Sequence, residues 1–345
     1  MVDINKIAAK LKSIGARIAE EVPDPTDFVS TGNLSLDIMS DGGIPFGYVV
    51  EFLGLSSSGK SLFIQQIIAN AQKQFEAIGV LVDRENAYTK ERGEQLGIDN
   101  SRLIIVKPAD IPTVTDAFKF IIKIVEETRA ADSKAHIIVG IDSISAFGKD
   151  TDLEKSDQGR KAKATHEGLR ESLKVVDANV LLLVANQITY KVGVQWGDPR
   201  TTTAGESMKY YSTVRFALED LHKIIDPRKG NEVVGNWIGV EVIKSRLGPS
   251  YRTCYLPHFY ATGIDYYGGY IRLLVDRGYL KPKNKEEFKR FKGKQVIYTG
   301  QGGEKEVYSE DDVEKLFQKH PELKFEEFPE YNLTGKDEEE DANKD

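Results

Sequence analysis

The chain has 345 residues, of which 40% are hydrophobic and 29% are charged. This balance excludes a chain that is disordered throughout, and the absence of any run of about 18 apolar residues argues against a membrane span. The length predicts one large domain, or one large domain with a smaller one. The single cysteine, Cys254, excludes an internal disulfide, and the N-terminus does not resemble a secretory signal, so we expect a cytoplasmic protein.

The net charge of −7 is unevenly distributed. Residues 301–345 contain 16 acidic and 6 basic side chains, which leaves the first 300 residues at +3. The acidity peaks in the C-terminal tail, residues 332–345. We expect either a solvated tail or one that competes with a polyanion for a basic surface, so acidity does not exclude nucleic acid as a partner.

The N-terminal segment has apolar residues at helical spacing over residues 4–18. A connector rich in proline and aspartate follows and ends near Phe28. We assign residues 1–29 to an N-terminal helix with its linker. Such a helix either docks onto another subunit or folds back on its own domain.

From about Ser30 the pattern changes to short β-branched runs that alternate with helical patterns. The predicted strands are Tyr48–Leu53, Val80–Asp83, Leu103–Val106, Ile137–Asp142 and Val180–Ala185. The predicted helices between them are Ser61–Phe75, Thr89–Leu96, Ile111–Glu127 and Gly159–Val176. Continuous apolar strands separated by helices predict an α/β fold, with a mostly parallel sheet covered by helices on both faces.

Three later runs, Val214–Leu218, Trp237–Lys244 and Arg252–Tyr255, have no helices between them and predict an antiparallel edge. A helical segment follows Gly268. We therefore place the core at residues 30–274 and a small C-terminal subdomain at 275–331. The lysine-rich run 281–294 predicts a solvated helix, or alternatively a landing surface for duplex DNA.

Residues 54–61 read GLSSSGKS, which fits the phosphate-loop pattern G-x-x-x-x-G-K-[ST]. An apolar strand precedes the loop and a helical pattern follows it, as this motif requires. Backbone N–H groups and the helix N-terminus would bind phosphate, Lys60 would reach the β- and γ-phosphates, and the Ser61 hydroxyl would bind Mg²⁺. The expected ATP contacts are Gly54, Ser56, Ser57, Ser58, Gly59, Lys60, Ser61 and Leu62.

Two carboxylates complete the expected chemistry. Asp142 ends an apolar strand and is predicted to assist Mg²⁺ binding, or alternatively to cap a helix. Glu85 lies just past another strand end, at the edge where open α/β sheets bind ligands. It is either the group that activates water for hydrolysis or a surface residue.

These motifs resemble the ATPase core of the RecA-type recombinases over residues 32–99. Residues 186–215 (NQITYKVGVQWGDPRTTTAGESMKYYSTVR) are similar to the second DNA-binding loop of that family. Residues 242–252 and 263–284 resemble phage recombinases of the UvsX type. The resemblance covers about residues 30–280 and implies a RecA-like P-loop fold, in a protein of a bacterial cell or of a phage.

The resemblance also implies roles for individual residues. Glu85 would be the catalytic glutamate and Asp142 the Mg²⁺-associated aspartate. Gln187 would sense the γ-phosphate and pass its state to the adjoining DNA loop. Lys244 and Arg246 would reach the ATP of a neighbouring subunit and neutralise charge that develops on its γ-phosphate.

Two further positions are assigned to ATP on the same basis. Arg92 stands where the family usually has an aromatic residue that packs on adenine, and its guanidinium can stack instead. Tyr260 would touch the nucleotide from the neighbouring subunit.

Two loops are expected to face DNA, at residues 147–160 and 189–205. The first is acidic and therefore the weaker candidate. In the second, cations and hydroxyls suit phosphates and an aromatic ring can stack on bases, without reading sequence. Its candidate residues are Lys191, Trp196, Arg200, Thr201, Thr202, Thr203 and Gly205.

The resemblance implies an ATP- and Mg²⁺-dependent recombinase that forms head-to-tail helical filaments on single-stranded DNA, searches duplex DNA and exchanges strands. Loader or mediator proteins and single-strand-binding proteins are its expected partners, and no membrane is expected to be involved. The alternatives are a hexameric helicase built on the same core, or a recombination mediator that exchanges no strands. A small-molecule kinase would need neither the DNA loop nor the pair Lys244 and Arg246.

Overall fold

The computed structural model describes residues 4–11, 26–147, 157–190, 200–202, 206–289, 291, 294–300 and 303–324. The expected acidic tail and the second half of the expected N-terminal helix lie outside these ranges. The first half is helix α1 (Ile4–Leu11), none of whose residues is buried. Within the described ranges, no helix combines the length and the hydropathy needed to cross a bilayer.

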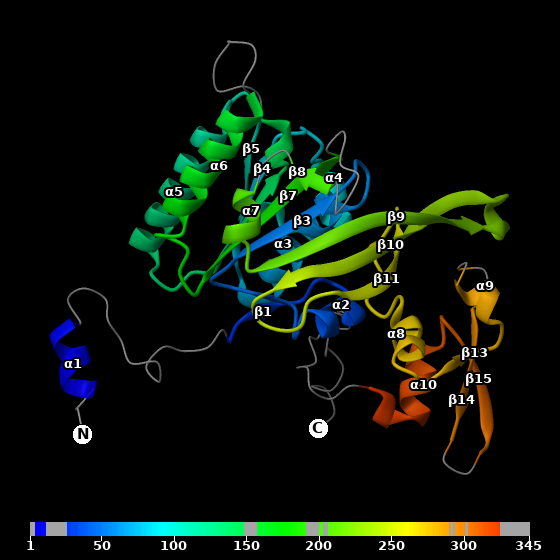
Figure 1. Cartoon of the computed structure of the whole chain (residues 1–345). Helices are drawn as coiled ribbons and strands as arrows, with labels where there is room; N and C mark the ends of the chain where they lie inside the picture. Colours follow the sequence, from blue (N-terminus) through cyan, green and yellow to red (C-terminus); the bar gives the residue numbers. More distant parts are fainter. Residues whose placement is uncertain are drawn as a thin grey trace, which may run out of the picture.

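A ten-stranded sheet forms the centre of the molecule (Figure 1). Its path runs β12-β11-β10-β9-β3-β7-β6-β4-β5, and β8 pairs with β7 away from this path. The strands from β9 to β5 are parallel to one another. Those of the core are β3 (Val49–Gly54), β4 (Ile78–Asp83), β5 (Leu103–Val106), β6 (Ile137–Asp142) and β7 (Val180–Tyr190). The α/β fold with a mostly parallel sheet is therefore confirmed.

Helices cover both faces of this sheet (Figure 1). Helix α3 (Lys60–Phe75) contributes Phe63 and Ile67 to the hydrophobic core on one face. On the other face, α5 (Val114–Ala131) and α6 (Asp157–Ser172) contribute Phe118 and Leu169. The shorter helices near the core are α2 (Leu34–Met39), α4 (Lys90–Gln95) and α7 (Ser207–Tyr211).

The two faces explain why the core strands are apolar without alternation. In β7, Leu181 and Leu183 belong to the core on the α3 face, whereas Leu182 and Val184 belong to the core on the α5 face. All four side chains are fully buried. Because a strand covered on both faces buries every side chain, the sequence pattern predicts such strands well.

The far edge of the sheet is antiparallel, as predicted, but its strands are longer than predicted. They are β9 (Val214–Asp226), β10 (Glu232–Ser245), β11 (Arg252–Phe259) and β12 (Gly263–Ile264). The β9–β10 hairpin projects beyond the core (Figure 1). Apolar patterning stops where the hairpin leaves the core, and Ile225 on its outer half is 52% exposed.

A separate three-stranded sheet lies in the C-terminal part, in the order β13-β14-β15. The single helix expected over 281–294 is wrong, because the run contains strand β13 and only a short helix, α9, whose Phe288 is buried. The domain boundary at residue 275 stays a prediction. The elements of this part are α8 (Tyr270–Asp276), β13 (Lys281–Pro282), α9 (Lys285–Lys289), β14 (Gln295–Thr299), β15 (Lys305–Ser309) and α10 (Val313–Lys319).

Near the start of the core, β1 (Phe28–Val29) pairs with β2 (Ile44–Pro45).

Candidate nucleotide site

The loop between β3 and α3 is shaped by two glycines. Gly59 has φ of 98°, in the region that favours glycine, and precedes the first residue of α3 without a side-chain cap. A Cβ on Gly54 would lie 2.2 Å from the Ser58 Oγ and 2.7 Å from the Leu218 carbonyl oxygen. The uncapped N–H groups at the start of α3, with the positive end of its dipole, suit a phosphate group.

Lys60 turns its ammonium group back onto this loop. Its Nζ donates to the carbonyl oxygens of Gly54 (3.2 Å) and Leu55 (2.6 Å), and the residue is only 8% exposed. Burial lowers the pKa of Lys60, while the negative charges of Glu85 and Asp142 oppose that shift. A phosphate would offer this buried cation a charged partner in place of neutral carbonyls.

Asp142 lies at the end of β6 and is buried. Burial raises its pKa to about 6, against the opposing effect of a hydrogen bond with the Ser61 side chain. In the described ranges, no group of three or more His, Cys, Asp or Glu side chains could hold a metal ion. A hydroxyl and one carboxylate nevertheless fit Mg²⁺, which takes few protein ligands beside phosphate oxygens and waters.

Glu85 is exposed on a turn that Asp83 organises. The Asp83 carboxylate accepts the N–H groups of Ala87 and Tyr88, both at 3.1 Å, and forms an ion pair with Lys107 at 2.9 Å. Asp83 pairs in register with Asp142 on the neighbouring strand β6. This pairing brings the two strand ends together, and with them Glu85, Asp142 and Lys60.

Gln187 lies beside the phosphate loop, because β7 pairs with β3 and sets Gln187 opposite Gly54. Its side chain is exposed and its N–H donates to the Ser145 Oγ at 3.1 Å. The fold therefore brings the predicted residues Lys60, Ser61, Glu85, Asp142 and Gln187 to one edge of the sheet. Their individual roles stay predictions.

Lys244 and Arg246 lie near the opposite ends of the parallel strands from the phosphate loop. Lys244 pairs in register with Arg215 at the start of β9, and β9 pairs with β3 so that Val214 is opposite Val50. From Val50 to Gly54 the strand β3 rises about 13 Å. The two cations are therefore separated from the phosphate loop of their own chain by about this distance along the strands.

Both cations bind the end of α7. The Lys244 Nζ donates to the Ser212 carbonyl oxygen at 2.6 Å, and the Arg246 guanidinium donates to the Tyr210 carbonyl oxygen at 2.6 Å. Burial, followed by the charge of Arg246, lowers the pKa of Lys244 to about 8. Cations at the C-terminal end of a helix interact favourably with its carbonyl groups.

Arg92 and Tyr260 lie next to each other in one chain. The Arg92 guanidinium donates to the Tyr260 carbonyl oxygen at 2.7 Å, and the Tyr260 side chain is exposed. Sequence reasoning expected Tyr260 to act from the neighbouring subunit. The contact places Tyr260 beside Arg92 within one chain, and the role of each residue in binding the nucleotide stays a prediction.

The predicted DNA loops are described only in part. Lys191, Trp196, Thr203 and Gly205 lie outside the described residues, as do residues 148–156 of the first loop. Arg200, Thr201 and Thr202 form strand β8, which pairs antiparallel with residues 188–190 of β7. Residues 189, 190 and 200–202 of the expected loop are therefore paired as strands, and the role of the loop in DNA binding stays a prediction.

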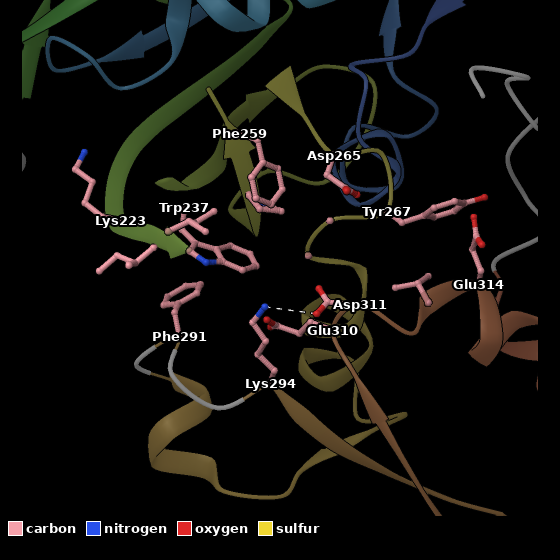
Figure 2. Close-up of a pocket in the computed structure, with 16 residues that line it drawn as sticks. Lys223, Trp237, Phe259, Asp265, Tyr267, Phe291, Lys294, Glu310, Asp311 and Glu314 are labelled. Carbon is pink, nitrogen blue, oxygen red and sulfur yellow. Dashed lines mark ion pairs between the residues drawn. The ribbon is translucent and has the colours of Figure 1, made fainter. Parts of the chain in front are cut away.

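A cavity of about 420 Å³ lies elsewhere, between the β9–β10 hairpin, β11 and the C-terminal part. Figure 2 shows the rings of Trp237 and Phe291 on one side, and the ion pair between Lys294 and Asp311 on the other. The residues that line it include none of the predicted site residues. We therefore do not assign this cavity to the nucleotide.

Sequence reasoning missed three residues that support the site. Asp83 was counted only as the end of a strand, although a buried aspartate there signals a cap for the turn that follows. Ser143 and Ser145, which connect Glu85 with Gln187, gave no signal because their partners lie far away in the sequence.

Comparison with known proteins gives a consistent result. Residues 3–265 match the family model described as the RecA N-terminal domain. Protein RecA of Chloroherpeton thalassium is 32% identical over 271 residues, which cover 77% of this chain and 72% of that protein. Protein RecA of Marinobacter nauticus is 34% identical over 258 residues, 73% of this chain and 71% of that protein. Protein RecA of Mycolicibacterium smegmatis is 29% identical over 294 residues, 84% of this chain and 79% of that protein.

Proposed function

Because the chain belongs to the RecA family, we propose that it is a DNA-dependent ATPase and recombinase. It would assemble as a helical filament on single-stranded DNA and exchange strands with a homologous duplex. The observation that carries this proposal is the convergence of Lys60, Ser61, Glu85 and Asp142 at one edge of the sheet. A buried cation, an oxygen pair for Mg²⁺ and an exposed carboxylate are the parts that phosphoryl transfer to water needs.

Each group has a distinct role in this proposal. Lys60 and the N–H groups at the start of α3 bind and orient the phosphates of ATP. Ser61 and Asp142 would hold Mg²⁺, which would neutralise charge on the phosphate oxygens. Glu85 accepts a proton from the attacking water, and the cap provided by Asp83 keeps its turn in place.

The position of Lys244 and Arg246 supports a head-to-tail assembly. Since they lie at the edge opposite Gly54, they would act on an ATP bound to a second copy. A repeated contact between two different faces of one chain generates a filament when it does not close. The apolar residues Ile4, Ile7 and Leu11 of α1, all exposed, are available to dock on that second copy.

The rate of ATP hydrolysis, measured with and without single-stranded DNA, tests the proposal. We expect DNA to stimulate turnover and electron microscopy to show helical filaments with a non-hydrolysable ATP analogue. Glu85→Gln should lower kcat by at least about 100-fold while ATP remains bound, because it removes the proton acceptor.

Glu91→Gln is the matched control, since Glu91 is another exposed carboxylate a few residues away on α4, and it should leave kcat unchanged. Unchanged turnover in Glu85→Gln would remove this residue from the mechanism. Closed hexameric rings in place of filaments would indicate a motor protein and contradict the recombinase.

A further inference from the structure

A row of three hydrogen bonds connects Glu85 with the backbone of β7. The Ser143 hydroxyl donates to the Glu85 Oε1 at 3.1 Å. The Ser143 and Ser145 hydroxyl oxygens are 3.0 Å apart, and the Gln187 N–H donates to the Ser145 Oγ at 3.1 Å. The row joins two predicted site residues that are about 100 positions apart in the sequence.

The direction of every bond in the row is fixed by its two ends. The backbone N–H of Gln187 can only donate, and an ionised Glu85 can only accept. The hydrogen of Ser143 is used on Glu85, so Ser145 must donate to Ser143. All three bonds therefore point from β7 toward the carboxylate, and bonds aligned in this way polarise and strengthen one another.

Ser145 takes the place of a missing strand neighbour. Pairing between β6 and β7 ends at Ile141 and Val184. Beyond that point β6 gives way to a short turn, residues 144–146, which presents the Ser145 hydroxyl to the Gln187 N–H. The Ser145 hydroxyl thus supplies a hydrogen-bond acceptor to β7 at Gln187, beyond the last residue that pairs with the β6 backbone.

The turn that carries Ser145 is itself held firmly. The Lys161 Nζ of α6 donates to the carbonyl oxygens of Ser145 at 2.7 Å and Phe147 at 2.9 Å. The Arg84 N–H donates to the Asp142 carbonyl oxygen at 2.7 Å. Because these bonds hold the backbone of the turn, a displacement at the end of β7 would change the hydrogen bond from the Gln187 N–H to the Ser145 hydroxyl.

We propose that Ser145 is a positioning residue, which acts through Ser143 to hold the Glu85 carboxylate in the orientation that hydrolysis needs. This orientation then depends on where Gln187 of β7 lies. Residues 188–190 of β7 pair with β8, so a ligand that binds to these two strands and shifts them would move Gln187 and, through Ser145, the carboxylate. The inference rests on the proposed ATPase function. It adds a coupling path that the family resemblance did not supply.

Steady-state hydrolysis with Ser145→Ala and Ser145→Thr gives the first test. We expect Ser145→Ala to lower the DNA-stimulated kcat about five-fold, the value of one hydrogen bond, with less than about a two-fold change in KM for ATP. Ser145→Thr keeps the hydroxyl and should restore most of kcat. The control is Ser172→Ala, which removes a buried serine hydroxyl that has no hydrogen-bond partner among the described residues.

Amide hydrogen exchange at Gln187 gives a readout that needs neither hydrolysis nor DNA. In Ser145→Ala this amide should exchange about ten-fold faster than in the unaltered chain, and in Ser145→Thr at nearly the original rate. An unchanged exchange rate in Ser145→Ala, or a kcat equal to that of the unaltered chain, would overturn the proposal. If the unaltered chain hydrolyses no ATP, the proposed function fails, and the exchange rate still decides whether the connection exists.

Discussion

At the scale of single residues, Asp37 shows how a buried carboxyl sets a pH dependence. Asp37 of α2 is 1% exposed, and it accepts hydrogen bonds from the Ser30 hydroxyl at 2.5 Å and the Thr31 N–H at 2.7 Å. Burial nevertheless raises its pKa from 3.8 to about 6. The folded chain therefore binds this proton more tightly than the unfolded chain does.

The sign of the resulting prediction follows from linkage. Stability supplied by the uncharged carboxyl is fully present below pH 3.8 and is lost as the pH rises through about 6. Asp37→Asn removes the titration. Between pH 4.5 and 7.5 the free energy of unfolding of the unaltered chain should fall by about 2 kcal/mol relative to this variant, as measured by urea denaturation. A difference that stays constant with pH would contradict the assignment.

The site residues differ in how far the sequence could predict them. The phosphate loop lies in one continuous segment, so its chemistry is visible in the sequence. Glu85 and Asp142 could be predicted because both follow apolar strands. Ser143 and Ser145 could not, because their roles depend on where the turn after β6 meets Gln187 of β7.

At the scale of elements, the junction of β3 and α3 leaves no room for a side chain at Gly54. A Cβ at Gly54 would meet the Leu218 carbonyl oxygen of β9, a backbone atom that cannot rotate away. We expect Gly54→Ala to lower the free energy of unfolding by about 1–3 kcal/mol. It should also weaken ATP binding by at least about ten-fold, because the loop must shift.

Calorimetric titration with ATP and thermal unfolding measure these two effects. Gly159→Ala on α6 is the matched control, because a Cβ there meets nothing within 4 Å. That change should preserve affinity and raise stability by up to about 1 kcal/mol, since alanine favours helix more than glycine. If Gly54→Ala binds ATP as tightly as the unaltered chain does, the loop can accommodate the additional methyl group and the prediction is wrong.

Elements with two buried faces could be predicted, whereas elements fixed by particular partners could not. Glu51 in the middle of β3 is fully buried, and its ion pair with Arg215 of β9 and hydrogen bond from Asn186 of β7 explain how a charge is accommodated there. The pairing of β7 with β8 was missed because threonine and glycine suggest a loop. The C-terminal sheet was missed because its strands have only two to five residues each.

At the scale of the whole molecule, the two ends of the parallel strands separate two functions. The phosphate loop lies at one edge, while Lys244 and Arg246 lie at the other, against α7. A chain with this arrangement cannot complete its own site with these cations. If they are needed for hydrolysis, the active unit is an interface between copies.

A mixing experiment distinguishes action between subunits from damage within one subunit. The double variant Lys244→Ala with Arg246→Ala keeps its phosphate loop but lacks the cations, and Glu85→Gln keeps the cations but lacks the proton acceptor. Each alone should hydrolyse ATP poorly. In a random equimolar mixture, about a quarter of the interfaces combine an intact loop with intact cations, so turnover should rise well above the sum of the two.

The contacts with α7 make this experiment necessary, because loss of Lys244 and Arg246 also removes hydrogen bonds within one chain. Damage of that kind cannot be repaired by a neighbouring copy. Arg228→Ala serves as the control, since that guanidinium is 91% exposed at the far end of the same hairpin, and it should leave turnover unchanged. If the turnover of the mixture only equals the sum of the turnovers of the two variants, Lys244 and Arg246 do not act on the ATP of a neighbouring copy. Recovery on mixing would show that ATP joins two copies and that nucleotide controls assembly.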